Sequence, residues 1–436
     1  MRFDGRVPDE QRTVSIQTDF VKTAAGSCLI ATGNTRVICT ASVEEIVPPF
    51  LKGKGQGWVT AEYAMLPAST GIRKKRDGIK KDGRGVEIQR LIGRALRQAV
   101  DLKALGERTI TLDCDVLEAD GGTRTASITG AMVALTCAID KLVQEKKILG
   151  SPIRHQIAAI SAGIIGDVPM LDLCYQEDSS AQVDMNFVMN EKGEMIEIQG
   201  TGEGRAFSRK ELDQLMAYGE KGIRELMEAQ KAALGERACH LCARPILLAA
   251  TGNEHKLKEL QHIFADFYQV LPMSAAGVTE EIEENGTTFA ENAIIKAEAV
   301  CAATGLPAIA DDSGLMVTAL NGEPGVYSAR YAGHHGDDEA NNDLLLEKMR
   351  GRSDREAFFV CALAFKRPGE KPLTAEGKCP GVILKERRGT GGFGYDPLFL
   401  YEPLGKTFAE VNEEEKNAIS HRARACIIMK EMMAEL

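Results

Sequence analysis

The pattern of apolar and polar residues predicts both strands and helices in each half of this chain. Residues 109–116 alternate apolar and polar side chains, which is typical of a half-exposed strand. Residues 127–143 are apolar almost throughout and predict a buried helix, whereas the helical period of residues 86–102 predicts an amphipathic one. Residues 246–250 and 254–264 repeat the order of strand and helix in the second half. We therefore expect α/β folds with mixed sheets (α+β) in both halves.

The chain divides near residue 240. An amphipathic helix runs from Ser208 to about Leu234 and ends at Gly235, and a new apolar strand starts at Ile246. A chain of 436 residues has room for two domains, each with its own core. The predicted first domain, linker and second domain are residues 1–238, 239–244 and 245–436.

The linker contains the pair Cys239-His-Leu-Cys242, the spacing of half a zinc site. Because no second pair lies nearby, we favour a plain linker over a metal or redox role. The eleven cysteines are scattered and odd in number, which favours free thiols in a reducing cytoplasm over a disulfide framework. The N-terminus lacks the apolar core of a signal peptide, and no apolar run approaches the ~20 residues of a membrane span. We expect a cytoplasmic protein without a membrane segment.

Charge separates the halves further. Residues 1–244 carry 33 basic and 33 acidic side chains, whereas residues 245–436 carry 20 and 30, so the net charge of −10 belongs to the second half. A neutral half with a concentrated basic loop can attract RNA, while an acidic half suits a small nucleotide bound together with a metal ion. This asymmetry predicts different substrates for the two halves.

Cations gather in residues 71–85, where seven of fifteen residues are basic and four are glycine. Such a loop suits a phosphodiester backbone, although a merely solvated loop has the same composition. In the helix that follows, Arg90, Arg94 and Arg97 share the face opposite the apolar side chains. We place Arg84 just before this helix, where unpaired N–H groups favour an anion.

The turn Asp120-Gly-Gly-Thr-Arg124 joins a strand to a helix. Its glycines let backbone amides approach an oxyanion, and Thr123 and Arg124 add a hydroxyl and a bidentate guanidinium. Asp178 and Asp184 follow six positions apart, and in an extended strand this even spacing places both on one face. If such a pair faces bound phosphates, it either holds Mg²⁺ or acts as acid and base. The alternative is that both residues are ordinary surface aspartates without a catalytic role.

Together these residues resemble ribonuclease PH, from the first residue to about Leu234. The motifs that carry the resemblance are Phe50-Leu-Lys-Gly53, Gly55-Gln-Gly-Trp58, Ala61-Glu-Tyr63, Glu87-Ile-Gln-Arg90, Ala119-Asp-Gly-Gly-Thr-Arg-Thr-Ala-Ser127 and Asp184-Met-Asn186. This family trims the 3′ ends of tRNA precursors, with inorganic phosphate as co-substrate, and releases nucleoside diphosphates. The resemblance implies a ribosomal protein S5 domain 2-like fold and assembly into a hexameric ring.

The resemblance also implies roles for individual residues. The phosphate-binding residues would be Arg84, Gly122, Thr123 and Arg124. Asp178 and Asp184 would be catalytic and hold Mg²⁺, and Arg73 and Arg76 would grip RNA together with the helix arginines. The family usually has another arginine where this chain has Ala68. The alternative is an RNA-binding ring subunit without turnover, which the two aspartates disfavour.

Residues 249–256 follow a strand and open a helix, as loops that bind phosphate or sugar groups do. A second short strand ends in Asp311 and Asp312. Since adjacent carboxylates on a strand point to opposite faces, we expect only one of them to bind a metal directly. Glu283, in the acidic turn 280–284, is the candidate second metal ligand. The alternative is that this turn is only a solvated loop.

A glycine-rich segment of this half ends in Phe393-Gly-Tyr-Asp396. Its two aromatic rings can stack on a base, and its aspartate can orient Tyr395 or bind the edge of the base, although a glycine hairpin is the structural alternative. On the expected last helix, His421 and Arg422 can bind the keto oxygen of a base, which an adenine amino group would not satisfy.

This half is similar to the inosine/xanthosine triphosphate pyrophosphatase family, which removes purine nucleotides with abnormal bases. The motifs are Thr251-Gly-Asn253, Phe289-Ala-Glu-Asn292, Ile309-Ala-Asp-Asp-Ser-Gly-Leu315, Gly325-Val-Tyr-Ser-Ala-Arg-Tyr331, Gly391-Gly-Phe-Gly-Tyr-Asp-Pro397 and Ser420-His-Arg422. The resemblance implies a two-lobed α/β fold, a homodimer, and hydrolysis of ITP, dITP or XTP to the monophosphate and pyrophosphate.

By this resemblance Asp312 accepts the proton from water and holds Mg²⁺ with Glu283, and Lys296 contacts phosphate. The implied nucleotide-binding residues are Thr251, Gly252, Asn253, Glu254, His255, Lys256, Ser313, Phe393, Gly394, Tyr395, Asp396, Lys416, His421 and Arg422. Members commonly have glycine at the position of His255, and we expect little effect because this loop binds largely through its backbone. The alternative is a nucleotide sensor without turnover.

Overall fold

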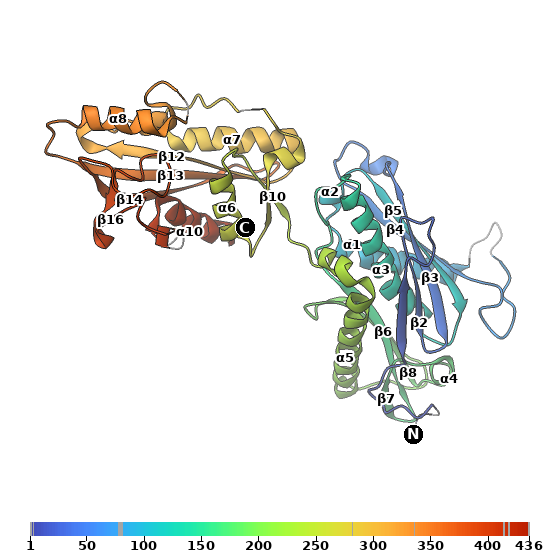
Figure 1. Cartoon of the computed structure of the whole chain (residues 1–436). Helices are drawn as coiled ribbons and strands as arrows, with labels where there is room; N and C mark the ends of the chain where they lie inside the picture. The colour runs from blue at the N-terminus through green and yellow to red at the C-terminus, as the bar shows by residue number, and fades with distance from the viewer. Residues whose placement is uncertain are drawn as a thin grey trace. The chain divides into compact units, whose positions relative to one another are not determined.

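The computed structural model describes the chain except residues 1, 3, 77–81, 281, 335, 413, 414, 417, 418, 435 and 436. The chain forms two compact units, Met1–Pro245 and Ile246–Leu436 (Figure 1). Five positions of the predicted basic loop, 77–81, and one position of the predicted acidic turn, Glu281, lie outside the described residues.

The first unit contains two sheets. One has the strand order β1-β2-β3-β5-β4 and is antiparallel except for the parallel pair of β4 and β5. The other is antiparallel with the order β7-β6-β8-β9. The strands are β1 Val14–Thr18, β2 Gly26–Thr32, β3 Thr35–Glu44, β4 Trp58–Met65, β5 Thr109–Glu118, β6 Ile157–Ile165, β7 Val168–Leu171, β8 Val183–Asn190 and β9 Met195–Gly202.

One long helix joins these two sheets into a single core. The helices and 3-10 turns of this unit are α1 Gly83–Ala99, α2 Leu102–Leu105, α3 Thr123–Gln144, α4 Tyr175–Asp178, α5 Arg209–Leu234, η1 Pro49–Leu51 and η2 Gly235–His240. Helix α3 packs on β2 and β3 of one sheet and on β6 of the other, which is why it is apolar on all sides. Contrary to our expectation, α3 is long and apolar enough to cross a membrane, but 83% of its apolar stretch is buried in the unit, as in the core helix of a globular fold.

Strand β2 approaches α3 closely at Gly26. A Cβ atom there would lie 2.2 Å from the carbonyl oxygen of Ala134 and 2.4 Å from the backbone nitrogen of Ala138. Since helix backbone cannot yield as a side chain does, we expect Gly26→Ala to destabilise the first unit by about 3 kcal/mol. Urea unfolding followed by the fluorescence of Trp58, the only tryptophan in the sequence, measures this unit selectively.

Gly71→Ala is the matched control for this substitution, because a Cβ atom at Gly71 would have no heavy atom within 4 Å. Its unfolding midpoint should stay near that of the unmodified protein. An equal loss in both variants would show that the contact between β2 and α3 is not the cause.

The second unit is built on one seven-stranded sheet with the order β11-β10-β12-β13-β14-β15-β16. Strands β11, β10 and β12 are parallel, and the remaining neighbours are antiparallel. The strands are β10 Ile246–Ala249, β11 Gln269–Pro272, β12 Ala308–Val317, β13 Glu356–Lys366, β14 Leu373–Ile383, β15 Phe399–Tyr401 and β16 Lys406–Thr407. The helices and 3-10 turns are α6 Glu254–Phe264, α7 Phe289–Thr304, α8 Asp338–Lys348, α10 His421–Ala434, η3 Met273–Ala276, η4 Thr318–Leu320, η5 Gly325–Arg330 and η6 Glu402–Leu404.

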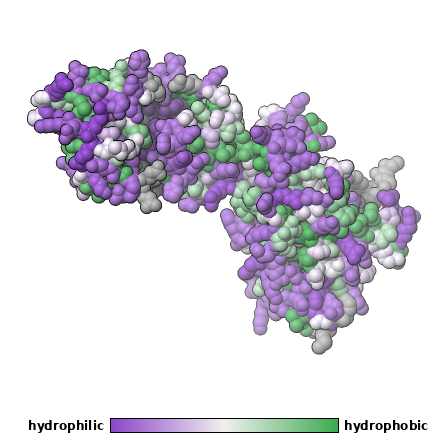
Figure 2. All heavy atoms as spheres, viewed as in Figure 1, coloured by the Kyte–Doolittle hydropathy of each residue, from purple (hydrophilic) through white to green (hydrophobic). Residues whose placement is uncertain are grey.

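Helices cover both faces of this sheet. Helix α7 lies on one face of β12 and β13, and α6 and α10 lie on the other (Figure 1). Along β12, Ala308 and Ala310 belong to the core under α7, whereas Ile309 belongs to the core under α6 and α10. This alternation continues into the two aspartates that follow, so the fold itself separates them. Outside these cores, hydrophilic side chains dominate the surface in the view of Figure 2.

Residues 239–244, predicted to be a linker, contact the first unit. Leu241 is buried in its core, His240 Nε2 lies 2.9 Å from the carboxylate of Asp140, and the N–H of Ala243 donates to the carbonyl of Ile153. All eleven cysteines are free thiols, and Cys239 and Cys242 are the exposed ones. The boundary at residues 239–244 stays a prediction.

Candidate active sites

The start of helix α3 is the centre of the candidate site in the first unit. Gly122, with φ of +65°, is its N-cap, and Thr123 and Arg124 are its first residues. The N–H groups and positive dipole end of this helix therefore lie where an anion can reach them. One guanidinium nitrogen of Arg124 donates to Oε1 of Gln199 at 2.8 Å, which orients the fork from strand β9.

Tyr63 is a residue of this site that our sequence analysis did not single out. Its hydroxyl lies 2.8 Å from Oγ1 of Thr123, and its ring is buried. Burial raises the pKa of Tyr63, while the charges of Arg84 and Arg124 lower it, so both guanidinium groups lie near this hydroxyl. The sequence contained a signal for this residue, because Tyr63 ends the motif Ala61-Glu-Tyr63 and occupies a buried position of strand β4.

Arg84 lies inside a helix and not before it as predicted. Helix α1 begins at Gly83, and the carboxylate of Asp82 caps it by accepting the N–H of Arg84 at 3.3 Å. The capping aspartate moves the start of the helix three residues earlier than hydrophobic periodicity indicated. Arg84 therefore belongs to the first turn, where its exposed side chain can reach an anion.

Asp178 and Asp184 share a site, but the predicted strand does not join them. Asp178 ends the short helix α4, whereas Asp184 lies in β8. The helical turn forms because Glu177 accepts hydrogen bonds from the N–H of Cys174 and from the guanidinium of Arg2.

Electrostatic coupling shows that the two carboxylates lie near the arginines. Burial raises the pKa of both aspartates, and the charge of Asp178 helps to raise that of Asp184 to about 6. The charges of Arg84 and Arg124 act in the opposite direction on both groups. The first unit thus places two cations, a helix N-terminus and two carboxylates in one site.

Asp184→Asn should stabilise the ligand-free first unit above pH 6. The folded-state pKa of Asp184, about 6, lies above its ordinary value of 3.8, so the stability that this group contributes falls as pH rises between these values. Asparagine does not titrate and avoids a loss of about 1–2 kcal/mol at pH 8, allowing for partial solvent screening. Urea unfolding in EDTA, followed through Trp58, should show a larger gain at pH 8 than at pH 5. Equal stability of both proteins at pH 8 would contradict this reading.

The predicted RNA-binding arginines differ in their surroundings. Arg73, Arg76 and Arg90 are exposed. Arg94 forms an ion pair with Glu197 at 2.5 Å. Arg97 donates to the carbonyl of Val59 and lies 4.3 Å above the ring of Trp58. Arg94, although exposed, and Arg97 therefore have intramolecular partners, and Arg73, Arg76 and Arg90 are the better candidates for phosphate contacts.

In the second unit, Asp311 and Asp312 lie on opposite faces of β12, as predicted. The carboxylate of Asp311 lies 3.1 Å from Nζ of Lys256 and 3.1 Å from Nε of Arg422. Burial acts to raise the pKa of Asp311, but these two cations more than offset it and hold the pKa well below its usual range. Asp311 is therefore a permanently charged anchor of an ion-pair cluster.

Asp312 has the opposite electrostatic environment. Its carboxylate accepts a hydrogen bond from the amide of Asn292 at 3.0 Å, and burial raises its pKa although Lys296 lowers it. A buried carboxylate with a raised pKa is suited to accept a proton. Asp312 thus has the environment of a base, and Asp311 does not.

Glu284, and not Glu283, lies beside this base. Oε1 of Glu284 is 2.8 Å from Nζ of Lys296, and its charge raises the pKa of Asp312. Glu283 is exposed. In an irregular turn neither a helical nor a strand period tells which of two adjacent acids points inward, so the sequence pattern alone did not separate them.

The first loop of this unit meets the glycine-rich segment. The side chain of Asn253 caps α6 by accepting the N–H groups of His255 and Lys256. The imidazole of His255 lies parallel to the ring of Phe393, with centroids 6.2 Å apart and planes 18° apart. The ammonium of Lys416 lies 4.6 Å from the same Phe393 centroid. His255, in a loop that we expected to bind largely through its backbone, therefore has a side-chain partner.

Tyr395 is not placed to stack on a base. Its ring is 4% exposed in the core, and its hydroxyl donates to the carbonyl of Ser328 at 2.9 Å. Asp396 does not orient Tyr395 but accepts hydrogen bonds from the N–H of Phe393 and from Lys416. The predicted roles of Tyr395 as a stacking ring and Asp396 as its partner are wrong, because tertiary packing buries the tyrosine.

The C-terminal residues lie deeper than expected. Helix α10 begins at His421, so Lys416 precedes it in the chain. The guanidinium of Arg422 contacts Asp311 and Glu259. The ring of His421 is buried and stacks on Phe359, and burial lowers its pKa, which keeps it neutral. Within the described part of the chain, His421 Nδ1 has no hydrogen-bond partner.

The remaining predicted nucleotide-binding residues lie around these groups. Thr251 and Gly252 precede the Asn253 cap, Glu254 is the first residue of α6, Ser313 Oγ lies 3.4 Å from Arg422, and the N–H of Gly394 donates to Asp338. The sequence-predicted residues therefore come from the loop before α6, from β12, from the glycine-rich segment and from the start of α10.

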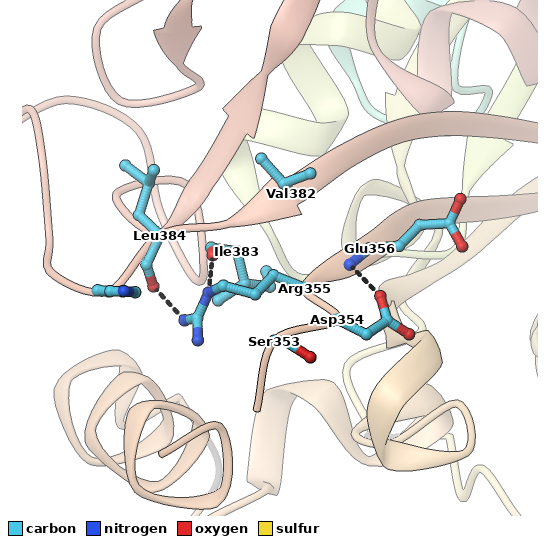
Figure 3. Close-up of a pocket in the computed structure, with 8 residues that line it drawn as sticks. Ser353, Asp354, Arg355, Glu356, Val382, Ile383 and Leu384 are labelled. Carbon is cyan, nitrogen blue, oxygen red and sulfur yellow. Dashed lines mark hydrogen bonds between the residues drawn. The ribbon is translucent and has the colours of Figure 1, made fainter. Parts of the chain in front are cut away.

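A cavity of about 520 Å³ lies in another part of this unit (Figure 3). Its walls are formed by residues 353–356 and 382–385. The guanidinium of Arg355 donates to the carbonyls of Ile383 and Leu384, so the main cation of this cavity is satisfied by backbone. It contains no predicted site residue, and we assign no chemistry to it.

The described residues contain no group of three or more histidine, cysteine, aspartate or glutamate side chains arranged to hold a metal ion. Mg²⁺, however, is commonly bound by one or two carboxylates together with substrate phosphates and water. The pair Asp178 and Asp184, and the pair Asp312 and Glu284, fit that requirement because each brings two mutually repelling carboxylates together.

Comparisons with known proteins agree with this division. The sequence model of the Ham1 family matches residues 247–432. Domains 1 and 2 of the 3′ exoribonuclease family match residues 10–139 and 155–222.

Solved structures match the two halves separately. The Ham1 protein of Staphylococcus aureus shares 42% sequence identity with this chain. The match covers 98% of that protein and 44% of this chain, with a TM-score of 0.42. A nucleoside-triphosphatase, or dITP/XTP pyrophosphatase, of Mycobacterium abscessus shares 41% sequence identity with this chain. The match covers 98% of that protein and 42% of this chain, with a TM-score of 0.38. A chain of the Archaeoglobus fulgidus exosome, from a structure with RNA bound to the active site, shares 23% sequence identity with this chain. The match covers 91% of that chain and 52% of this one, with a TM-score of 0.45.

Proposed function

We propose that this chain, which belongs to the Ham1 family over residues 247–432 and to the 3′ exoribonuclease family over residues 10–139 and 155–222, is a cytoplasmic bifunctional enzyme. The first unit would shorten RNA 3′ ends with phosphate, tRNA precursors above all. The second would hydrolyse ITP, dITP or XTP to the monophosphate and pyrophosphate. The observation that carries this proposal is the separation of two complete sets of phosphate-binding and acidic groups, one in each compact unit.

In the first unit, inorganic phosphate would bind at the start of α3, between the guanidinium groups of Arg84 and Arg124 and the hydroxyl of Thr123. Tyr63 would hold that hydroxyl in place. The bound phosphate oxygen then attacks the terminal phosphodiester in line, the bond to the preceding 3′ oxygen breaks, and a nucleoside diphosphate leaves. Positioning and charge stabilisation supply the rate in this mechanism, with no covalent intermediate. Mg²⁺ held by Asp178 and Asp184 would neutralise charge on the leaving oxygen.

In the second unit, Asp312 would accept a proton from a water molecule that attacks the α-phosphorus. The bond to the bridging oxygen breaks, and pyrophosphate leaves. Lys296, fixed by Glu284 and by the carbonyl of Asp311, would contact the phosphates. Mg²⁺ held by Asp312 and Glu284 would screen the charge of the triphosphate. His421, neutral and with Nδ1 unpartnered among the described residues, would bind the keto oxygen of the base.

Two assays test the proposal. A tRNA precursor with a 3′ extension should lose nucleotides as diphosphates when phosphate is present, and release of monophosphates without phosphate would reject phosphorolysis. In the second assay, ITP should yield the monophosphate and pyrophosphate far faster than ATP. Turnover of ATP at the rate of ITP would overturn the keto selectivity.

The competing function for either half is binding without turnover, as an RNA-binding or nucleotide-sensing module. The raised pKa values of Asp184 and Asp312 favour catalysis, since a sensor has no need of such groups. We also propose a hexameric ring through the first unit and dimer contacts through the second. Analytical ultracentrifugation of the full chain tests both.

A further inference from the structure

His255 is placed to contact a base although no motif requires it. It lies in the first turn of α6, and its N–H is held by the cap of Asn253, which fixes its backbone. Its side chain is exposed and reaches the glycine-rich segment, where it faces Phe393. Two aromatic rings from segments about 140 positions apart therefore stand parallel at the surface of the nucleotide site.

The separation of these rings is informative. Their centroids are 6.2 Å apart, with planes 18° apart. Bases in nucleic acids stack at about 3.4 Å, so a base held between two rings needs roughly 6.8 Å. The centroids of the two rings are thus nearly as far apart as those of two rings that enclose a base, and their planes are close to parallel.

The surroundings of Phe393 keep that ring in position. Its N–H donates to the buried carboxylate of Asp396, which also accepts from Lys416, and the Lys416 ammonium lies 4.6 Å from the ring centroid. Phe393 is therefore held through its backbone N–H by Asp396 and at its ring face by the ammonium of Lys416. The side chain of His255, in the first turn of a capped helix, is exposed to solvent.

We propose that His255 forms the second wall, opposite Phe393, of a slot for the purine base of a nucleoside triphosphate. This inference rests on the function proposed above for the second unit and adds a base-binding residue to it. Stacking acts through the flat face of any base and does not read its edge, so His255 would tighten binding of purines in general. Selection of keto over amino groups would remain with residues at the edge of the base.

His255→Ala tests the slot, with His255→Phe as the conservative variant. Alanine should raise KM for ITP between about 5-fold and about 100-fold, the range that loss of one stacking contact produces, and kcat should stay within about twofold. Phenylalanine, which keeps a flat ring, should hold KM near that of the unmodified enzyme. His262→Ala is the matched control, because His262 is exposed in the last turn of the same helix.

Inhibition by inorganic tripolyphosphate, which has no base, separates stacking from a general disturbance of the loop. Its inhibition constant should be the same in His255→Ala and in the unmodified enzyme. An unchanged KM for ITP in His255→Ala, or a matching rise for His262→Ala or for tripolyphosphate, would overturn the slot. Failure of the unmodified enzyme to hydrolyse ITP would instead reject the proposed function itself.

Discussion

Asp312→Ala should lower ITP hydrolysis by about 100- to 10,000-fold, the range expected for loss of a general base, and leave RNA phosphorolysis unchanged. Asp312 is 8% exposed, lies against Asn292 and Lys296, and has a raised pKa. Neither its partners nor its charge is shared with the first unit, because all of these contacts lie within residues 246–436. Pyrophosphate release from ITP and diphosphate release from RNA should be measured on the same preparation.

Asp184→Ala is the reciprocal variant and should abolish phosphorolysis while ITP hydrolysis stays unchanged. Both variants should keep the unfolding midpoint of the unit that they do not touch. Loss of both activities from either substitution would mean that the two reactions depend on a shared site or a shared assembly. The idea of two independent phosphate-binding sites would then have to be abandoned.

Elements with strong local signals were predictable from sequence. The boundaries expected for α6, residues 254–264, are those observed, and the helix predicted from Ser208 is α5 with its capping box at Ser208. In both cases the cap is a side chain within three residues of the N–H groups that it satisfies. The fold assignment to ribonuclease PH-like and Ham1-like halves also holds, because it rested on long collinear motifs.

The errors lie where residues distant in sequence decide the outcome. Asp178 is helical because Glu177 is held by Arg2, 175 positions away. Tyr395 is buried because its hydroxyl reaches the carbonyl of Ser328, 67 positions away. No local period encodes such contacts, so motif spacing indicated the right neighbourhood but not the conformation or exposure of individual side chains.

Arg124→Ala should raise KM for phosphate in the RNA reaction by about 30- to 1,000-fold, the usual consequence of removing one partner of a charged hydrogen-bonded contact. Arg124 stands at the N-terminus of α3, fixed by Gln199 and near Asp178 and Asp184, so its loss removes one of the two guanidinium charges, with Arg84, that offset both carboxylates. Initial rates over a phosphate series, at saturating RNA, measure the effect.

Arg124→Lys should recover only part of the loss, since an ammonium keeps the charge but not the planar fork that binds two oxygens. Arg36→Ala is the control, because Arg36 is exposed on β3 and its ion pair with Glu118 lies between two exposed side chains. The affinity for RNA in the absence of phosphate should be similar in all of these variants, because we expect it to depend on Arg73, Arg76 and Arg90 and not on the phosphate site at the start of α3. If Arg124→Ala instead weakened RNA binding and left KM for phosphate unchanged, the start of α3 would be an RNA contact, and the attacking phosphate would have to bind elsewhere.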